Sequence, residues 1–362
     1  MRFFEHQREA RKQSRRLSAV FSLIVLAELL IANAFLALPF VVLPWLLGIH
    51  APLGDFLPLY FFETVTFVVL LFILGGWWIE LSRLRQGGVA LAERIGAQRA
   101  QRLQNNRGNA QAQTREIQFS NIVEELALAA RMRAPQAYVL PREMGINAFA
   151  AGWGERDSVV CITQGALDGL NRDEISGLVA HELSHIYEGD TRLNMRLAGM
   201  VLGLELVHNM GQDMMESGNA LGLMLGPSVR LTGWLGWVAA RAMKAAISRE
   251  REFLADARAI QFTRSKEGLG GALRKVAWQQ QHGAGETKVL HPAVQHMLLV
   301  GDELTQSRRL QTHPPIQERI RRIYGRSMPT LEVLADGEGE WQNPFAHSQP
   351  LPPPHEESYR AR

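Results

Sequence analysis

Apolar residues fill two long runs near the start of the chain, and polar residues become frequent only after them. The first run covers roughly 17–47 and the second roughly 56–79, with Pro52 and Gly54 in the turn between them. Because about 20 apolar residues can span a bilayer as a helix, this pattern predicts a transmembrane hairpin over 17–80. A secretory signal peptide would have a shorter apolar core and a small-residue cleavage site, so an uncleaved anchor fits better.

The distribution of basic residues predicts the orientation of this hairpin. The N-terminal segment 1–16 holds six lysines and arginines, and the next basic residue after Arg16 is Arg83. By the positive-inside rule both ends of the hairpin are cytoplasmic. We therefore expect a multi-pass protein of a bacterial-type inner membrane, with the downstream domain on the cytoplasmic side. The alternative for the basic segment is a nucleic-acid-binding arm, but its position directly before a span favours the topological role.

Two carboxylates interrupt the predicted spans. Glu28 and Glu63 lie within the apolar runs, where burying a carboxylate in lipid is costly, so each is a functional candidate. The alternatives are a position near the interface, a partner on a neighbouring helix, or a protonated side chain.

After the hairpin, the hydrophobic periodicity predicts a mainly helical domain with a small sheet. Residues 81–115 are typical of a polar linker that is helical in part around 89–103. Asn171 and Glu174 have the spacing of a capping box, which marks the start of a helix. The predicted helices are 116–131, 172–187, 247–262, 269–282 and 316–324, and the predicted short strands are 137–140, 146–150 and 158–163. We expect an α+β fold over 116–334 and a disordered tail over 335–362.

A second apolar region, at 197–210 and 221–247, allows two interpretations. It contains Glu205 and Arg230, which a clean membrane span would not carry. The region 197–247 is therefore either a second hairpin that dips into the bilayer or an amphipathic pair that lies on it. We favour association with the membrane, and the number of crossings stays open.

Composition excludes several classes of protein. With 46% hydrophobic and 21% charged residues, the chain is not wholly disordered. A lone cysteine, Cys161, rules out an intrachain disulfide framework and a cysteine-based metal cluster. Its alternation with Val159 predicts a buried, small apolar side chain. The net charge of +3 is too small to indicate a nucleic-acid partner.

The motif His181-Glu-Leu-Ser-His185 lies in the predicted helix over 172–187. Histidines four positions apart face the same way on a helix, so both imidazoles can bind one metal ion. Glu182 lies next to the first of them and can act as general base toward a water on that metal. A pair of surface histidines is the alternative, but the apolar residues around the motif favour a buried helix in which polar groups need partners.

A catalytic zinc ion needs a third protein ligand and one open position. The segment 248–256 offers Glu250, Glu252 and Asp256. Glu252 and Asp256 are four positions apart and share a helix face, so one can bind the metal while the other hydrogen-bonds a ligating histidine. Spacing alone leaves the choice between Glu250 and Glu252 open, and a solvent-facing row of charges is the structural alternative.

Several blocks of the sequence resemble the HtpX-like membrane zinc metallopeptidases, which are relatives of the CAAX prenyl endopeptidases. The resemblance covers roughly 87–325 and follows the order of the family. Its blocks are Gly87-Gly88, Ile146-Asn-Ala-Phe, 170–185, Gly189-Asp190, Arg249-Glu-Arg-Glu-Phe-Leu-Ala-Asp256 and Thr312-His-Pro-Pro. It implies a gluzincin-type HExxH metallopeptidase domain.

The resemblance also implies a metal centre. One Zn²⁺ per chain is expected on His181, His185 and Glu252, with Glu182 as the general base. Asp256 is expected to hydrogen-bond one of the ligating histidines.

For the substrate, the resemblance implies four further residues. His313 is expected to approach the metal and support the oxyanion, although by itself it would be the start of a helix before two prolines. Arg319 lies one turn beyond it and is expected to bind substrate. The region of Asn147 and Ala148 resembles an edge strand that receives an extended peptide by β-augmentation.

Together these observations predict a membrane-anchored zinc-dependent endopeptidase, and the resemblance implies unfolded or damaged membrane proteins as substrates. One alternative is a non-hydrolytic membrane chaperone or adaptor that keeps structural zinc, but such a site is normally closed by four protein ligands and gives Glu182 no role. The other is a processing peptidase for prenylated tails, which would need more spans to enclose its substrate. The expected partners are polypeptides and the lipid bilayer, and nothing in the sequence indicates an oligomeric state.

Overall fold

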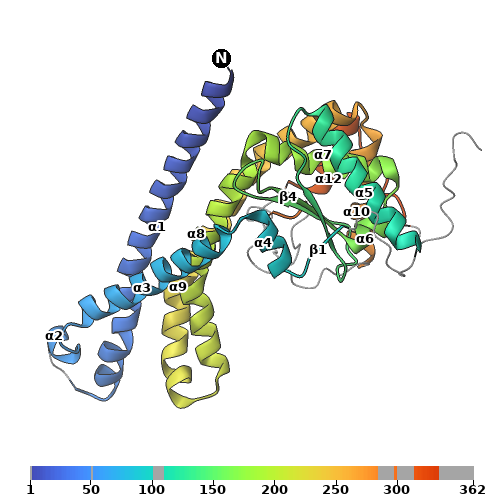
Figure 1. The fold of residues 1–362 in the computed structure, drawn as a ribbon. Coiled ribbons are helices and arrows are strands. Elements are labelled where there is room, and N and C mark those ends of the chain that lie inside the picture. Colours follow the sequence, from blue (N-terminus) through green and yellow to red (C-terminus); the bar gives the residue numbers. More distant parts are fainter. Residues whose placement is uncertain (1, 50–51, 101–109, 284–296, 300–313, 334–362) are drawn as a thin grey trace, which may run out of the picture.

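The structure is a computed structural model that describes residues 2–49, 52–100, 110–283, 297–299 and 314–333. Long helices form an extended arm at one end of the molecule, and shorter helices enclose a small sheet at the other (Figure 1). The fold is mainly helical with one mixed four-stranded sheet, which confirms the predicted α+β class. The predicted tail over 335–362 lies outside the described residues.

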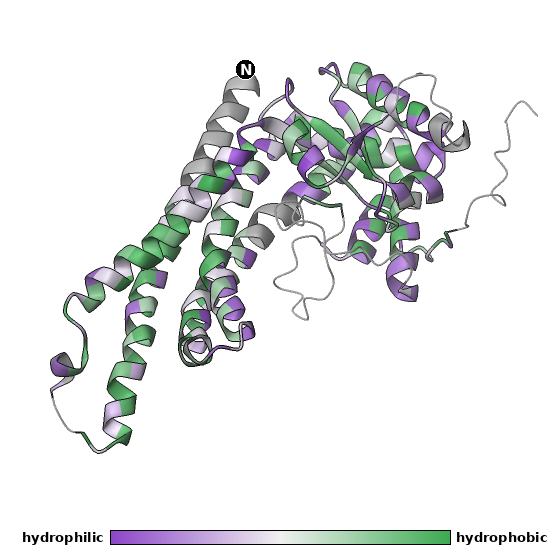
Figure 2. Ribbon diagram, turned by 60° about the horizontal axis from the view of Figure 1, so that its bottom comes forward, coloured by the Kyte–Doolittle hydropathy of each residue, from purple (hydrophilic) through white to green (hydrophobic). Residues whose placement is uncertain are grey.

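Two N-terminal helices are long and apolar enough to cross a membrane. Helix α1 covers Arg2–Leu46 and α3 covers Phe61–Leu84, with the one-turn helix α2 (Leu53–Phe56) in their connection. Only 22% and 28% of their most apolar stretches are buried inside the molecule. The core helix of a soluble protein would bury its apolar side chains, whereas Leu23, Leu30 and Phe67 of these helices are 65–67% exposed, where lipid can cover them. Figure 2 shows that both helices are hydrophobic over most of their length.

The second apolar region forms a hairpin of two long helices. Helix α8 covers Asp190–Glu216 and α9 covers Ala220–Thr263. The segment 247–262 is helical as predicted, but it is not a separate helix, because α9 runs through it without a break. Its second half, 237–263, contains no glycine or proline that would end a helix. Among the described helices, only α1 and α3 pass as candidate spans by length and hydropathy.

The sheet has the strand order β1-β2-β4-β3. Its strands are β1 (Gln98–Arg99), β2 (Gln136–Leu140), β3 (Ala148–Ala151) and β4 (Val159–Thr163). Strands β2 and β4 are parallel, and the outer strands pair antiparallel to them. The three predicted strands are confirmed. Strand β1 was not predicted, because the linker's helix α4 (Gly87–Arg94) is shorter than expected and two polar residues then pair with β2.

Both faces of the sheet are buried. Val160 and Ile162 pack into the cluster that includes the apolar side of helix α7, and Val159 and Cys161 alternate with them into a second cluster with α4. Cys161 is therefore a buried apolar side chain, as predicted. Strand β3 forms the edge of the sheet that contacts α7.

Helix α7 (Arg172–Glu188) is fixed at both ends. The Asn171 side chain accepts a hydrogen bond from the Glu174 amide, and the Glu174 carboxylate accepts one from the Asn171 amide, so the predicted capping box is confirmed. At the other end Gly189 adopts a φ of 77°, a conformation that L side chains rarely adopt and that ends the helix.

Close packing against helix α10 (Glu267–His282) sets the position of α7. A Cβ atom at Gly177 would lie 2.1 Å from the backbone nitrogen of Leu269, so only glycine allows this approach. Three further helices surround the pair: α5 (Ala110–Ala129), α6 (Gln164–Gly169) and α12 (Ile316–Tyr324). The helices predicted over 116–131, 269–282 and 316–324 are thus confirmed, and α6 was not predicted.

Candidate metal centre

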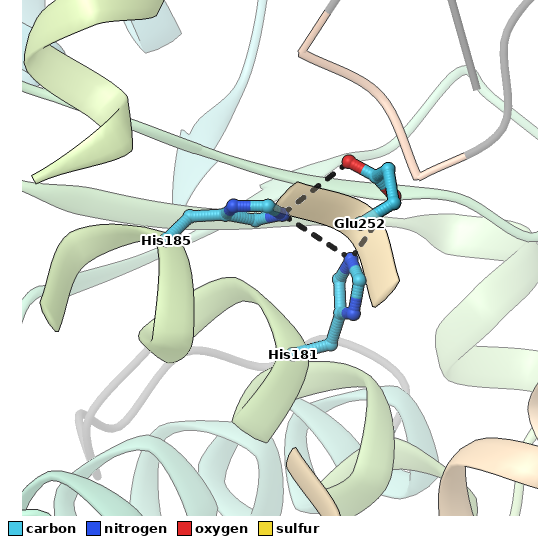
Figure 3. A group of neighbouring side chains, drawn as sticks. All are labelled: His181, His185 and Glu252. Atoms are coloured by element: carbon cyan, nitrogen blue, oxygen red, sulfur yellow. Dashed lines mark hydrogen bonds and ion pairs between the residues drawn. The ribbon is translucent and has the colours of Figure 1, made fainter. Parts of the chain in front are cut away.

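Two helices bring three potential metal ligands together. His181 and His185 lie one turn apart on α7, and Glu252 reaches them from α9 (Figure 3). The two Nε2 atoms are 3.3 Å apart. Glu252 places its Oε2 3.5 Å from Nε2 of His181 and its Oε1 3.6 Å from Nε2 of His185. With one ligand atom taken from each residue, the three atoms lie within 4.8 Å of one another.

These separations fit a tetrahedral zinc ion. Ligand atoms bound to zinc at 2.0–2.2 Å in tetrahedral geometry lie roughly 3.3–3.6 Å from one another. The separation of the two histidine nitrogens, 3.3 Å, falls in that range, and each nitrogen has one of the two Glu252 oxygens at 3.5 or 3.6 Å. Two imidazoles and one carboxylate are also a ligand set of catalytic zinc sites, which keep the fourth position for water or substrate.

A carboxylate orients each histidine ring from behind. Asp256 Oδ1 lies 3.0 Å from Nδ1 of His181, and Asp190 Oδ2 lies 3.1 Å from Nδ1 of His185. A proton held on Nδ1 by such a partner leaves the lone pair of Nε2 directed at the shared point. Both rings are therefore set to bind a cation through Nε2.

Two arginines hold these carboxylates in place. Arg319 of α12 is fully buried, and its Nε and Nη2 donate to the two oxygens of Asp256 at 2.9 and 2.7 Å. Its Nη1 lies 3.4 Å from Glu252 Oε2 and donates to the Leu299 carbonyl at 3.1 Å. Arg251 pairs with Asp190. Bidentate guanidinium pairs are rigid, so the ligands sit in a fixed frame.

The electrostatics of the cluster favour positive charge at its centre. Burial alone lowers the pKa of His181, but its hydrogen bonds to Asp256 and Glu252 outweigh burial and raise the pKa to about 9. Burial also lowers the pKa of His185, and Asp190 and Glu252 raise it above its usual value. Burial acts to raise the pKa of Asp256, whereas Arg319 and His181 bring it below the usual range. A site that attracts a proton so strongly also suits a divalent cation.

Glu182 is buried beside the first histidine, with a side chain outside the ligand set. Burial raises the pKa of its carboxyl group, and the nearby His181, His185 and Arg319 counteract part of that rise. A carboxylate with raised proton affinity is suited to take a proton and later release it.

Comparison with known proteins identifies the family. The sequence profile of peptidase family M48 matches residues 112–327. This chain belongs to peptidase family M48. The His181, Glu182, His185 and Glu252 cluster lies inside the matched range, so the chain is a metallopeptidase, a hydrolase of peptide bonds.

Curated relatives of this M48 chain support the same assignment. The Protease HtpX homolog of Dictyoglomus turgidum is 36% identical, over 60% of this chain and 72% of the relative. Those of Streptococcus uberis and Syntrophobacter fumaroxidans are 31% and 35% identical, each over 57% of this chain and over 72% and 75% of the relative. No solved structure matches the chain. The expected resemblance to HtpX-like peptidases is thereby confirmed.

The M48 structure brings most of the predicted site residues to one place. His181, Glu182, His185, Glu252 and Asp256 lie close together between α7 and α9. His313 lies outside the described residues, as does the side chain of Glu250.

Arg319, which the sequence analysis expects to bind substrate, lies beside the carboxylates of the metal centre. Its guanidinium is buried against Asp256, so its contacts within the described chain are structural. Its pKa is raised further above the usual range, because Asp256 and Glu252 outweigh burial, which lowers it.

Strand β3 carries the predicted substrate edge, and part of that edge is covered. Asn147 is buried, and its side-chain oxygen accepts from the Ala148 amide at 3.0 Å. The Asn147 carbonyl accepts from Thr163 of β4, so the Ala148 carbonyl faces the outer side, where it accepts from the Leu299 amide at 2.9 Å.

Sequence reasoning missed the roles of Asp190 and Arg251. Asp190 follows His185 by five positions, directly after the glycine that ends α7. The pair Gly189-Asp190 was visible as a sequence block. The left-handed conformation of Gly189 ends α7 and starts α8, which places the Asp190 carboxylate beside the His185 ring. Arg251 looked like a member of a charged helix face, and only the packing of α9 against α7 shows its partner.

Proposed function

We propose that this M48 peptidase is a membrane-anchored, zinc-dependent endopeptidase. The observation that carries the proposal is the cluster of His181, His185 and Glu252 at zinc-compatible distances, with Glu182 buried next to it. The outward apolar faces of α1 and α3 support the membrane anchor.

In this mechanism His181, His185 and Glu252 hold one zinc ion, while Asp256 and Asp190 keep the two rings oriented. Zinc, when bound, supplies the Lewis acidity that polarises the scissile carbonyl and acidifies the attacking water. Glu182 takes a proton from that water and then delivers it to the nitrogen of the leaving amine. His313 is proposed to help stabilise the oxyanion, as the family resemblance implies.

The substrate is proposed to bind as an extended strand along the outer edge of β3. The Ala148 carbonyl on that edge already accepts from Leu299. Within the described part of the chain, no backbone hydrogen bond from outside the sheet reaches Ala150, the next residue that faces outward. A peptide that adds main-chain hydrogen bonds there needs no particular side chains, which suits unfolded or damaged membrane proteins as a substrate class.

Replacing Glu182 by glutamine tests the mechanism. The amide keeps the size of the side chain but cannot take a proton, so we expect unchanged zinc content and melting temperature and a fall in the cleavage rate of about 10²–10⁴-fold. Zinc content, thermal melting and casein degradation should be measured on one preparation. Glu125→Gln is the matched control, because its carboxylate is 60% exposed on α5, away from the centre.

The rival functions predict different outcomes. A chaperone or adaptor with structural zinc would keep its cellular function in Glu182→Gln, whereas a peptidase would lose it. A processing peptidase for prenylated tails would cleave a farnesylated peptide and leave casein intact. A Glu182→Gln protein that retains zinc and cleaves casein at the wild-type rate contradicts the proposed role of the base.

A further inference from the structure

A cavity of about 530 Å³ lies where the membrane helices meet the peptidase domain. Its lining includes Ser18 of α1 and Trp77 of α3, together with Arg85 just after α3, Arg196 of α8, and Trp153 and Asp157 from the loop between β3 and β4. Figure 1 shows α3 leading from the helical arm into α4 at the border of the domain. The volume falls within the range of small-ligand sites, roughly 300–1,000 Å³.

The position of this cavity coincides with one end of both candidate spans. The span in α1 begins at Leu17, next to Ser18, and the span in α3 ends at Leu84, next to Arg85. Aromatic side chains and arginines are the residues that proteins place at the level of lipid head groups. The cavity therefore lies at the membrane surface on the side of the peptidase domain, if α1 and α3 cross the bilayer as proposed.

The walls of the cavity are held in place by contacts between the two parts of the molecule. The Trp153 indole N–H donates to the Leu84 carbonyl at 2.7 Å, which ties the β3–β4 loop to the end of α3. Trp77 contacts the ring of Phe21, with 6.1 Å between centroids. The cavity is thus bounded by a built junction of helices and loop.

The polar lining favours an anion. Both oxygens of Asp157 accept backbone amide hydrogen bonds, from Trp153 and Gly154 at 2.9 Å each. These hydrogen bonds stabilise the negative charge of the carboxylate. Two arginines, Arg85 and Arg196, line the same cavity. Burial and the nearby Arg192 lower the pKa of Arg196, and an anion in the cavity would favour its charged form.

We propose that this cavity binds the phosphate head group of an anionic phospholipid, with Arg85 and Arg196 as the anion-binding side chains. The inference rests on the proposed membrane anchoring. The acyl chains would continue along α1 and α3, where Val20 and Leu23, within two turns of Ser18, are 45% and 66% exposed. Guanidinium groups suit this role because they bind phosphate oxygens through paired hydrogen bonds. A bound lipid would join α1, α3 and α8 to the β3–β4 loop, and hence to the sheet whose edge strand contacts α7.

The test uses the purified full chain in neutral detergent and measures binding by native mass spectrometry. The probes are dioctanoyl phosphatidylglycerol, dioctanoyl phosphatidylcholine and glycerol 3-phosphate. We expect phosphatidylglycerol to bind at least about tenfold more tightly than either of the other two, because only it combines net negative charge with acyl chains. Equal binding of phosphatidylcholine would overturn the selection for anionic lipid, and equal binding of glycerol 3-phosphate would point to a soluble phosphate ligand instead.

Single substitutions locate the site. Arg85→Gln and Arg196→Gln should each weaken phosphatidylglycerol binding about tenfold. The matched controls Arg83→Gln and Arg192→Gln remove the same charge from exposed neighbours that do not line the cavity, and they should change binding less than about twofold. If all four variants weaken binding equally, the attraction is a diffuse charge effect and the proposed site is refuted.

The outcome is separable from that of the proposed function. Binding in detergent does not depend on peptidase activity, so an inactive enzyme would leave it unchanged. Extraction of cell membranes with carbonate tests the anchor independently, because a peripheral protein is released and an integral one is retained. If carbonate releases the protein and the protein still binds phosphatidylglycerol selectively, the proposed membrane anchor is contradicted and the proposed lipid site is supported.

Discussion

At the scale of single residues, the metal centre is a set of nested charge pairs. Each ligating ring has a carboxylate behind it, and each carboxylate has an arginine behind it: His181 with Asp256 and Arg319, and His185 with Asp190 and Arg251. A buried carboxylate without a cation would be costly, so the arginines allow the negative charges to remain beside the site. The frame thus keeps the ligands ready for a cation.

The first prediction at this scale concerns the two orienting carboxylates. Asp256→Asn and Asp190→Asn should each weaken zinc binding about 10–100-fold, because the rings lose the partner that fixes their orientation and basicity. Glu252→Ala should be more severe, since it removes a ligand. Zinc affinity is measured by competition with a chelator, and Asp213→Asn on the exposed side of α8 serves as the control. Unchanged affinity in both Asp variants would mean that these contacts do not support the metal.

The second residue prediction concerns Arg319. Its guanidinium is fully buried and contacts Asp256 and Glu252, so Arg319→Ala leaves buried carboxylates without their cation. We expect a loss of about 3–5 kcal/mol in unfolding free energy. Arg319→Lys should recover only part of it, because an ammonium group cannot form the bidentate pair. Chemical denaturation measures the loss.

Arg321→Ala is the control for that experiment, because this side chain is 61% exposed on the same helix. A substrate-binding role, as expected from the sequence, would instead raise KM in Arg319→Lys and leave stability intact. Measuring both KM and the free energy of unfolding of Arg319→Lys therefore decides between a structural role and a substrate-binding role.

At the scale of elements, the site depends on how closely α7 packs. Gly177 on α7 faces the backbone of Leu269 on α10. Helix α9 also packs against α7, and this contact brings Glu252 close to the two histidines. Any shift of α7 moves both ligating rings relative to Glu252. Packing and metal geometry are thus coupled through one helix.

Gly177→Ala tests this coupling. The new Cβ would lie 2.1 Å from a backbone nitrogen, which cannot rotate away, so the helices must separate. We expect a loss of about 1–3 kcal/mol in stability and weaker zinc binding, because the displaced helix carries His181 and His185. Ser176→Ala, at the neighbouring position, should leave both quantities nearly unchanged. A fully stable Gly177→Ala protein with normal zinc affinity would show that the interface adapts.

Local chemical signals explain which elements could be predicted from the sequence. The capping box at Asn171 and Glu174 and the alternation through Val159 and Cys161 are written into neighbouring residues, so α7 and β4 were predictable. Strand β1 has only two polar residues and exists because β2 lies beside it. The continuity of α9 was missed because a change from apolar to charged residues resembled a boundary, although nothing there ends a helix.

In the candidate site, too, the features encoded in neighbouring residues could be predicted, and the contacts between distant segments could not. The spacing of His181 and His185 indicates a metal pair by itself, whereas the choice of Glu252 over Glu250 came from the family resemblance. The contacts of Asp190 with Arg251, and of Arg319 with Asp256, join distant segments through tertiary packing, which a local pattern does not encode.

At the scale of the whole molecule, the peptidase domain sits at one end of an apolar arm. Helix α8 packs against α3 in the arm and α9 packs against α1, and the same two helices carry Asp190, Glu252 and Asp256 into the site. Movement of the arm is therefore connected to the metal ligands by continuous helices. This arrangement gives the proposed anchor a direct structural path to the catalytic centre.

The arginine distribution predicts how this molecule lies in the membrane. Six lysines and arginines precede α1's apolar stretch, the next one is Arg83, and the connection near Pro52 has none, so the peptidase domain should face the cytoplasm. Cysteines introduced singly at Pro52 and at Glu155, both exposed, report the two sides, because the native Cys161 is buried. A membrane-impermeant maleimide should label Pro52→Cys in intact cells with a permeable outer envelope, and Glu155→Cys only after lysis. Labelling of Glu155→Cys in intact cells, with Pro52→Cys protected, would reverse the orientation and place the peptidase site outside the cytoplasm.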